Sequence, residues 1–355
     1  AREEGPVRAH SSQPIHTHIQ GGELREMIRR LRIENFRGIR EGELELFPLT
    51  ILLGANNSGK TTVLEALLLA HGPAHRQPYP DIMSVELLRR LHTTLGAEGF
   101  SFLLYDYSAK EARITISSDE EAWELSMTRE EDRILVREPP QLGGQELTLP
   151  MGPKGFSYSP RGFSKALFIR PDLTKPACEY LKRIWPDVWK HAPEVARALS
   201  KLVREDYVNF TMEPFHGGEP TLYAFLKDGR RIRLGDLGDG VQVLAVAMLL
   251  YELLRPEVLL WDDVEAHMNP SMLLFLASWL AGRVAEGTQV VVSTHSIEAV
   301  RLIAGAVEEL VGDVLRICLL SLRDGILRAK VLTIEEVEEL KRAGIDVRMG
   351  EGFLI

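Results

Sequence analysis

Cysteine is nearly absent from this chain of 355 residues, which contains only Cys178 and Cys318. Two cysteines form no recognisable disulfide or zinc framework, so the small disulfide-stapled and zinc-binding classes are excluded. No apolar run reaches the roughly eighteen residues that a membrane-spanning helix needs, and no signal-peptide pattern opens the chain. We therefore expect a cytoplasmic protein that makes no contact with a membrane.

An excess of positive charge is also missing. The net charge is −9, so the protein surface as a whole does not attract nucleic acid as a strongly basic domain would. Arginines do gather near the first predicted strand and in a predicted hairpin further on: Arg29, Arg30, Arg32, Arg37 and Arg40, then Arg230, Arg231 and Arg233. Such arginines are more often solvated charges on strand faces and in turns, and a DNA-binding patch stays the second interpretation.

Residues 1 to 26 lack apolar periodicity and are rich in polar residues. They indicate a flexible leader, with Met27 as a plausible natural start. Three scattered histidines in this stretch have no spacing that predicts a metal site. The remaining chain, with 45% apolar residues overall, is long enough for one large or two ordinary domains.

A glycine-rich loop carries the first motif of the chain. Residues 54 to 62 read Gly-Ala-Asn-Asn-Ser-Gly-Lys-Thr-Thr, between an apolar strand at 49 to 53 and an apolar helix at 62 to 70. This order predicts a phosphate loop, whose amides curl around a nucleoside triphosphate at a helix start. Lys60 would reach the β- and γ-phosphates, and the Thr61 hydroxyl would hold Mg²⁺. The predicted nucleotide-binding residues here are Gly54, Asn56, Asn57, Ser58, Gly59, Lys60, Thr61 and Thr62.

Two further apolar stretches end in polar residues. The segment 257 to 265 is an apolar run that ends with Asp262, Asp263 and Glu265, and the segment 289 to 296 contains His295. Parallel strands place their carboxyl ends at one edge of a sheet, where ligands bind. We expect Asp262 in the Mg²⁺ shell, Asp263 beside the attacking water and His295 near the γ-phosphate. A histidine in this position is usually a capping or packing residue, and the expected strand ends beside it are the reason to place His295 near the phosphate.

A fourth motif, Leu-Gly-Asp-Gly-Val-Gln at residues 237 to 242, precedes an apolar helix at 243 to 254. By itself it could be an ordinary Asp-Gly turn. In this order, the four motifs resemble those of ABC-type ATPases of the RecF, SMC and OLD (overcoming lysogenization defect) group. The opening segment 28 to 39, the phosphate loop and the Leu-Gly-Asp-Gly turn look most like the OLD-type members.

This resemblance implies an α/β fold. We expect a P-loop NTPase with an ABC-type head, built on a mixed or parallel core sheet flanked by helices, with an antiparallel β lobe and a short helical insert. Residues 27 to 355 would form a single head. An insert at about 71 to 207 would hold a helix (82 to 95), a meander (100 to 107, 112 to 117, 122 to 127 and 133 to 138), a strand at 166 to 169 and helices broken by Pro186 and Pro193.

The family also implies dimerisation around ATP. Two heads of a homodimer would enclose ATP and Mg²⁺, and Gly238 and Gly240 of one chain would meet the γ-phosphate bound by the other. An aspartate at the helix N-cap, Asp239, would compete with that phosphate. The family's usual glutamate is replaced by the shorter Asp263, which predicts slow turnover, while Glu265 could share the catalytic role. The residue that usually contacts the attacking water, a glutamine, cannot be identified.

The rest of the chain predicts a helix (297 to 310), a hairpin (315 to 322 with 326 to 332) and a last helix (334 to 343). We expect neither the long arms of SMC proteins nor a Toprim nuclease domain in this chain, so any nuclease would be a partner protein. Two functions stay open: a slow ATPase acting on DNA or a partner in repair or genome defence, and an ATP-sensing subunit that restrains a toxin or nuclease. A metabolite kinase is disfavoured because it leaves the later motifs unexplained.

Overall fold

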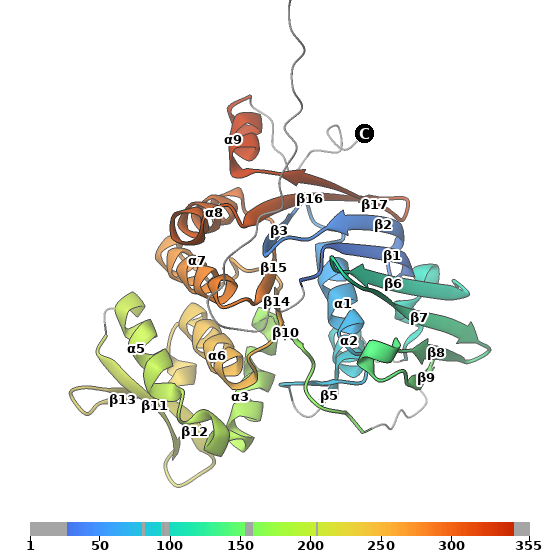
Figure 1. Cartoon of the computed structure of the whole chain (residues 1–355). Helices are drawn as coiled ribbons and strands as arrows, with labels where there is room; N and C mark the ends of the chain where they lie inside the picture. Colours follow the sequence, from blue (N-terminus) through green and yellow to red (C-terminus); the bar gives the residue numbers. More distant parts are fainter. Residues whose placement is uncertain are drawn as a thin grey trace, which may run out of the picture.

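The computed structural model describes residues 27–79, 82–93, 95, 99–152, 159–203 and 205–343. The expected leader, residues 1 to 26, lies outside this part. Figure 1 shows a central sheet with helices on both sides, a β-rich region on the side of β6 to β9, and a region of helices and a small sheet on the other side. Both regions adjoin the central sheet.

The centre of the main sheet is parallel. Five strands run side by side in the order β10 (Ala166–Ile169), β14 (Val258–Trp261), β15 (Gln289–Thr294), β3 (Leu49–Leu53) and β16 (Leu315–Arg323). Every residue of the first four is buried, because helices cover both faces. The carboxyl ends of β3, β14, β15 and β10 therefore meet at one edge, as the sequence predicted.

The other half of the main sheet is largely antiparallel. Beyond β16 follow β17 (Ile326–Leu332), β2 (Ile39–Glu45), β1 (Arg30–Phe36), β6 (Glu111–Ser117), β7 (Ala122–Glu130), β8 (Arg133–Arg137) and β9 (Glu146–Pro150). Buried and exposed residues alternate along β1 and β6, which is typical of strands with one solvated face. Within the described residues this sheet has twelve strands.

Helices pack on both faces of the sheet. Helix α1 (Lys60–Ala70) contacts β15, β10 and β6, and α2 (Ser84–His92) packs on it. On the other face, α7 (Pro270–Ala285) contacts β15 and α8 (Ile297–Val311) contacts β16, with α9 (Ile334–Arg342) behind α8. The expected α/β class with a mixed sheet flanked by helices is confirmed.

A second, three-stranded sheet lies with the remaining helices. It consists of β11 (Tyr207–Pro214), β12 (Pro220–Leu226) and β13 (Arg231–Arg233). Around it lie α3 (Thr174–Arg183), α4 (Trp185–Val188), α5 (Ala192–Val203) and α6 (Asp239–Leu254). Helix α6 contacts β10, α3 and α5, so it joins this region to the central sheet. The predicted interruptions near Pro186 and Pro193 are confirmed, since each proline lies in the first turn of a new helix.

In the segment after α1, one prediction was wrong, one helix has different bounds and one strand was missed. The expected strand at 100 to 107 is a pair of 3-10 turns, Ser101–Leu103 and Tyr105–Tyr107. Phe100, Leu103 and Leu104 are the buried residues, and this spacing follows a helical turn, not a strand. The expected helix at 82 to 95 begins at Ser84, because Ile82–Met83 (β5) pair with Arg76–Gln77 (β4). Strand β9, with Leu147 and Leu149 buried, was missed.

The later predictions agree with the structure. Helix α8, the β16 and β17 hairpin and helix α9 lie within one residue of the expected bounds. Within the described part of the chain, no helix is long and apolar enough to cross a membrane.

Candidate nucleotide-binding site

The loop between β3 and α1 is shaped by glycines. A Cβ added at Gly54 would lie 2.5 Å from the Ser58 hydroxyl and 2.7 Å from the Leu320 carbonyl oxygen, so no larger residue fits. Gly59 has a φ of 93° and Asn57 a φ of 64°, both in the left-handed region. The Ser58 hydroxyl is buried and has no hydrogen-bond partner among the described residues. A tight loop with an unsatisfied buried hydroxyl fits a bound polar ligand.

Lys60 curls back over this loop. Its ammonium group donates hydrogen bonds to the carbonyl oxygens of Gly54 (3.0 Å) and Ala55 (2.9 Å). Burial lowers the pKa of Lys60, while the carboxylates of Asp263, Asp262 and Glu265 act in the opposite direction. The lysine thus lies within the loop and faces a group of acids, as a residue that binds phosphate oxygens next to a cation should.

Thr61 and Asp262 come together across the site. The Thr61 hydroxyl lies 3.0 Å from Oδ2 and 3.2 Å from Oδ1 of Asp262, although 201 residues separate them in sequence. The Ser293 hydroxyl at the end of β15 donates to Oδ1 of the same carboxylate over 2.5 Å. The backbone N–H of Asp262 donates to the Ile169 carbonyl oxygen (2.9 Å), which holds the acid against the end of β10.

Burial raises the pKa of Asp262, and the nearby charge of Asp263 adds to this effect. The hydrogen bond from Ser293, the charge of Arg170 and the hydrogen bond from Thr61 oppose it. Hydroxyl and carboxylate oxygens are the hard donors that Mg²⁺ prefers, and Mg²⁺ binds through one or two carboxylates plus substrate phosphates. Among the described residues no group of three or more His, Cys, Asp or Glu side chains is arranged to hold a metal alone. The site therefore fits Mg²⁺ brought with a nucleotide.

The other acids follow β14 in a tight turn. Asp263 is exposed, has a φ of 49°, and its backbone N–H donates to the Ser293 hydroxyl over 2.9 Å. Glu265 is mostly buried, and its Oε1 accepts a hydrogen bond from the His295 backbone N–H and lies 3.0 Å from His295 Nδ1. Oε2 of Glu265 is buried without a hydrogen-bond partner among the described residues. The three predicted catalytic residues thus gather at the edge that holds Asp262.

The Leu-Gly-Asp-Gly turn opens α6 as expected, with one correction. Gly238 is the N-cap and Asp239 is the first helical residue, so the prediction of an N-cap aspartate was wrong. No side chain caps this helix start. Gly238 is exposed with open space around it, whereas a Cβ at Gly240 would lie 2.5 Å from the His267 carbonyl oxygen. The Asp239 carboxylate lies 3.7 Å from His267 Nδ1.

Sequence reasoning missed two residues near Asp262. Ser293 binds both the Asp262 carboxylate and the Asp263 backbone. Arg170 follows β10, and its Nε lies 4.0 Å from Oδ2 of Asp262. The apolar strand at 166 to 169 was predicted, but the sequence did not show that this strand pairs with the strand at 258 to 261. Once β10 is known to pair with β14, residue 170 is placed beside residue 262.

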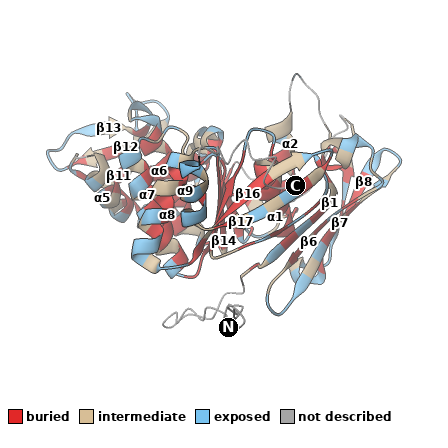
Figure 2. Ribbon diagram, turned by 90° about the horizontal axis from the view of Figure 1, so that it is seen from above, coloured by how far each residue is buried: buried red, intermediate tan, exposed pale blue. Residues whose placement is uncertain are grey.

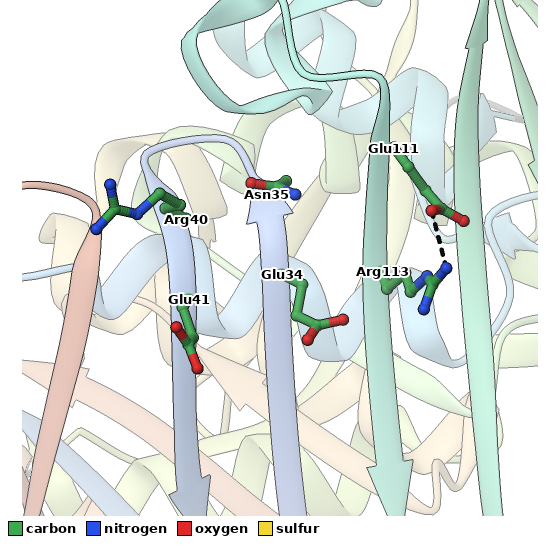
Figure 3. A pocket seen from close by; sticks show the side chains of 6 residues that line it. All are labelled: Glu34, Asn35, Arg40, Glu41, Glu111 and Arg113. Carbon is green, nitrogen blue, oxygen red and sulfur yellow. Dashed lines mark hydrogen bonds and ion pairs between the residues drawn. The ribbon is translucent and has the colours of Figure 1, made fainter.

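Three of the arginines near the first strand are paired with acids. Arg29 pairs with Asp119, Arg30 with Glu43 and Arg32 with Glu34. A hollow of about 470 Å³ lies on the exposed side of β1, β2 and β6. Figure 3 shows the side chains that line it. That lining consists of Glu34, Asn35, Arg40, Glu41, Glu111 and Arg113, and Arg113 donates to Glu111 over 2.8 Å. Three carboxylates against two guanidinium groups do not favour a polyanion.

Comparison with known proteins agrees with this geometry. A family model described as "AAA ATPase domain" matches residues 27–125, and one described as "AAA domain, putative AbiEii toxin, Type IV TA system" matches residues 187–301. An OLD nuclease of Thermus scotoductus is 46% identical over 46 residues, which are 13% of this chain and 9% of that protein. The DNA replication and repair protein RecF of Salmonella paratyphi B is 51% identical over 53 residues, 14% of this chain and 15% of that protein.

The fold matches solved structures over most of the chain. An SMC head bound to the C-terminal winged-helix domain of ScpA aligns with a TM-score of 0.52 and 16% identity, over 88% of this chain and 99% of that one. Taken together, these matches support an ABC-type ATPase of the RecF, SMC and OLD group. The SMC head of Pyrococcus furiosus, solved with a coiled coil and bound to ScpA, gives a TM-score of 0.51 at 12% identity over 89% and 98% of the two chains.

Each of the two family matches contains part of the candidate site. The first contains the phosphate loop with Lys60 and Thr61, and the second contains the start of α6, Asp262 and His295. The curated relatives are matched over only a small part of their own length. The expected ABC-type head fold is confirmed, and the matches support the expected family. The assignment of roles to single residues stays a proposal.

Proposed function

We propose that this ABC-type ATPase binds MgATP in the loop between β3 and α1, hydrolyses it slowly, and closes head to head with a second copy around the nucleotide. In this proposal it acts in DNA repair or genome defence, on nucleic acid or with a separate nuclease. One observation carries the assignment: the Thr61 hydroxyl meets the Asp262 carboxylate beside the glycine loop. This pair supplies the two oxygen donors that a nucleotide-bound Mg²⁺ needs.

Each group of residues in the site has its own role in phosphoryl transfer to water. The loop amides from Gly54 to Thr62 and the Lys60 ammonium bind and orient the phosphates, and Thr61 and Asp262 hold Mg²⁺. When bound, the cation neutralises charge on the phosphate oxygens. Asp263, exposed at the site edge, accepts the proton of the attacking water. Glu265 orients His295 through Nδ1, and the imidazole, when protonated, can donate a hydrogen bond from Nε2 toward the γ-phosphate.

In the closed dimer, the start of α6 of the partner chain contacts the other side of the nucleotide. The start of α6 has no side-chain cap, and Gly238 is exposed, so its first amides are open to an anion on a partner chain. Asp239 opposes such an anion, and His267 at 3.7 Å offsets its charge when protonated. Gly240 contributes by packing, since only glycine fits against His267.

Calorimetry with MgATP tests the binding step. The wild-type chain should bind, and Lys60→Ala should weaken binding at least about tenfold, or about 1.4 kcal/mol. Lys165→Ala is the matched control, because Lys165 pairs with Glu257 beside the amino-terminal end of β10. Wild-type protein that binds no MgATP, or equal loss in both variants, contradicts the proposal.

Sedimentation with a non-hydrolysable ATP analogue tests closure. Wild-type protein should shift from monomer to dimer, and Gly238→Arg should stay monomeric while it still binds the analogue, because a side chain at 238 meets open space in the monomer. Gly305→Arg, exposed on α8, is the control and should dimerise. A Gly238→Arg variant that still dimerises would remove the start of α6 from the interface.

A second function is favoured by the compensated charges of the β1 surface. Because Arg29, Arg30 and Arg32 are paired with acids, an ATP-sensing subunit that restrains a toxin or nuclease needs no DNA contact there. Phosphate release with and without duplex DNA separates the two functions. Strong stimulation by DNA supports the ATPase acting on DNA, whereas negligible turnover with tight ATP retention supports the regulatory subunit.

A further inference from the structure

Arg170 occupies a distinctive place at the edge of the sheet. It is the first residue after β10, and β10 pairs with β14 so that Ile169 lies opposite Trp261. The next residues along the two strands are therefore Arg170 and Asp262. The Arg170 side chain is 23% exposed, and its Nε lies 4.0 Å from Oδ2 of Asp262.

The Arg170 guanidinium is bound to an exposed acid, Asp172, and not to a buried one. Its guanidinium makes two parallel hydrogen bonds to Asp172, Nε to Oδ1 at 3.0 Å and Nη2 to Oδ2 at 3.1 Å. The Asp172 side chain is 53% exposed, so this pair contributes little to stability. The nearby Arg37 is different, because it is paired with Glu65, whose side chain is fully buried. Of these two guanidinium groups, Arg170 is the one that can turn to a ligand.

We propose that Arg170 exchanges its contact with Asp262 for the terminal phosphate of ATP and so distinguishes ATP from ADP. This inference rests on the proposed function, since it needs MgATP in the loop. An Asp262 carboxylate that binds a divalent cation attracts Arg170 less, and the terminal phosphate of a nucleotide in the loop would offer Arg170 another anion beside Asp262. Arginine binds phosphate oxygens in a two-pronged geometry that gives strong, directed contacts.

The position of Arg170 also connects the nucleotide to α6. Asp172 lies in the 3-10 turn Pro171–Leu173, which leads directly into α3, and α3 packs on α6. Asp172 lines a cavity of about 900 Å³ whose wall also includes Asp239 and Gln242 at the start of α6. Because Arg170 directly precedes the 3-10 turn, a shift of Arg170 toward the phosphate would be transmitted along the backbone to α3 and so to α6.

Paired binding measurements test the inference. Dissociation constants for a non-hydrolysable MgATP analogue and for MgADP are measured by calorimetry on wild type, Arg170→Ala, Arg170→Lys and the control Arg137→Ala. Arg137 is a matched control because it ends β8 in a pair with an exposed acid, Glu146. We expect wild type and the control to prefer the ATP analogue at least about tenfold, and Arg170→Ala to bind both ligands within about twofold. Arg170→Lys should give an intermediate ratio.

Hydrogen exchange of the amides in residues 174 to 183 gives a readout that a loss of local packing does not mimic. In wild type the ATP analogue should slow exchange there more than ADP does, and in Arg170→Ala the two ligands should give equal exchange. An Arg170→Ala variant with the wild-type ratio overturns the inference, and so does one that keeps the exchange difference. If that variant does not fold, a wild-type ratio in Arg170→Lys and Arg170→Gln overturns it equally. Absence of MgATP binding in wild type instead contradicts the proposed function.

Discussion

The Thr61 hydroxyl lies 3.0 Å from Oδ2 of Asp262, across the boundary between α1 and the end of β14. Parallel pairing of β3, β15 and β14 makes this contact, because it brings the ends of three strands from distant parts of the chain to one edge. The Thr61 hydroxyl donates a hydrogen bond to the Asp262 carboxylate. The two groups that the sequence predicts as Mg²⁺ ligands therefore lie together in the structure.

Thr61→Val should separate metal-dependent from metal-independent binding. Valine keeps the shape but removes the oxygen that meets Asp262, so affinity for MgATP should fall about tenfold or more, while affinity for ATP in the presence of a chelator should change less than about twofold. Calorimetry in both conditions measures this. Thr115→Val, on β6, serves as the control and should change neither value. An equal loss with and without Mg²⁺ would assign Thr61 to the phosphates instead of the metal.

Asp263→Asn and Glu265→Gln should differ in turnover. Asp263 is exposed at the site edge, and loss of its carboxylate as proton acceptor should lower kcat about 10²-fold while nucleotide binding persists. Glu265→Gln keeps an oxygen that can accept from the His295 backbone, so its kcat should fall by only about tenfold. Single-turnover phosphate release measures both. A larger loss in Glu265→Gln would transfer the proton-accepting role to Glu265.

Gly54→Ala tests the shape of the loop. The added methyl group would lie 2.5 Å from Ser58 Oγ and 2.7 Å from the Leu320 carbonyl oxygen, and since a backbone atom cannot easily move away, the loop must shift. We expect loss of nucleotide binding and a decrease of about 1–3 kcal/mol in the free energy of unfolding. Gly305→Ala, in an exposed helical position with open space, should raise it by about 0.5–1 kcal/mol. Denaturant unfolding compares the two.

The sequence predicted the elements whose patterns are local and uniform. Strands such as Leu49–Leu53 are apolar throughout, and the glycine loop has a fixed spacing, so both could be recognised without neighbours. The segment from 100 to 107 has the composition of a strand but the burial pattern of a helical turn, and composition alone led to the wrong prediction. Local propensity is a weak guide where tertiary contacts decide the backbone.

The site residues that the sequence did not predict, Arg170 and Ser293, are placed by pairing between strands that are distant in sequence. No feature of residues 166 to 172 alone indicates that Arg170 lies beside Asp262, because the contact depends on β10 joining the edge of the sheet next to β14. Ser293 was likewise hidden inside a predicted strand, and its role appears only when β15 lies beside β14. The sequence thus identified the residues of contiguous motifs and missed those whose partners come from the sheet order.

A buried cluster behind the phosphate loop gives a pH prediction. Glu65 of α1 is fully buried and is paired with Arg37, and it also accepts a hydrogen bond from His92 Nε2 at 2.8 Å. Burial, with the positive charges of Arg37 and Arg170, lowers the pKa of His92 to about 4. Because Arg37 already neutralises Glu65, a second positive charge on His92 is unfavourable in the folded state.

The sign of the effect follows from the lowered pKa. An unfolded histidine binds its proton below a pH of about 6.5, whereas folded His92 does so only below about 4. The unfolded state therefore binds more protons between these values, and the free energy of unfolding should fall as the pH decreases from about 6.5 to about 4. His92→Gln should flatten this part of the curve, since a glutamine amide can donate to Glu65 without titrating. Denaturant unfolding of both proteins at several pH values measures it, with His191→Gln as the control outside the cluster, and an equally steep curve in His92→Gln would mean that other groups cause the pH dependence.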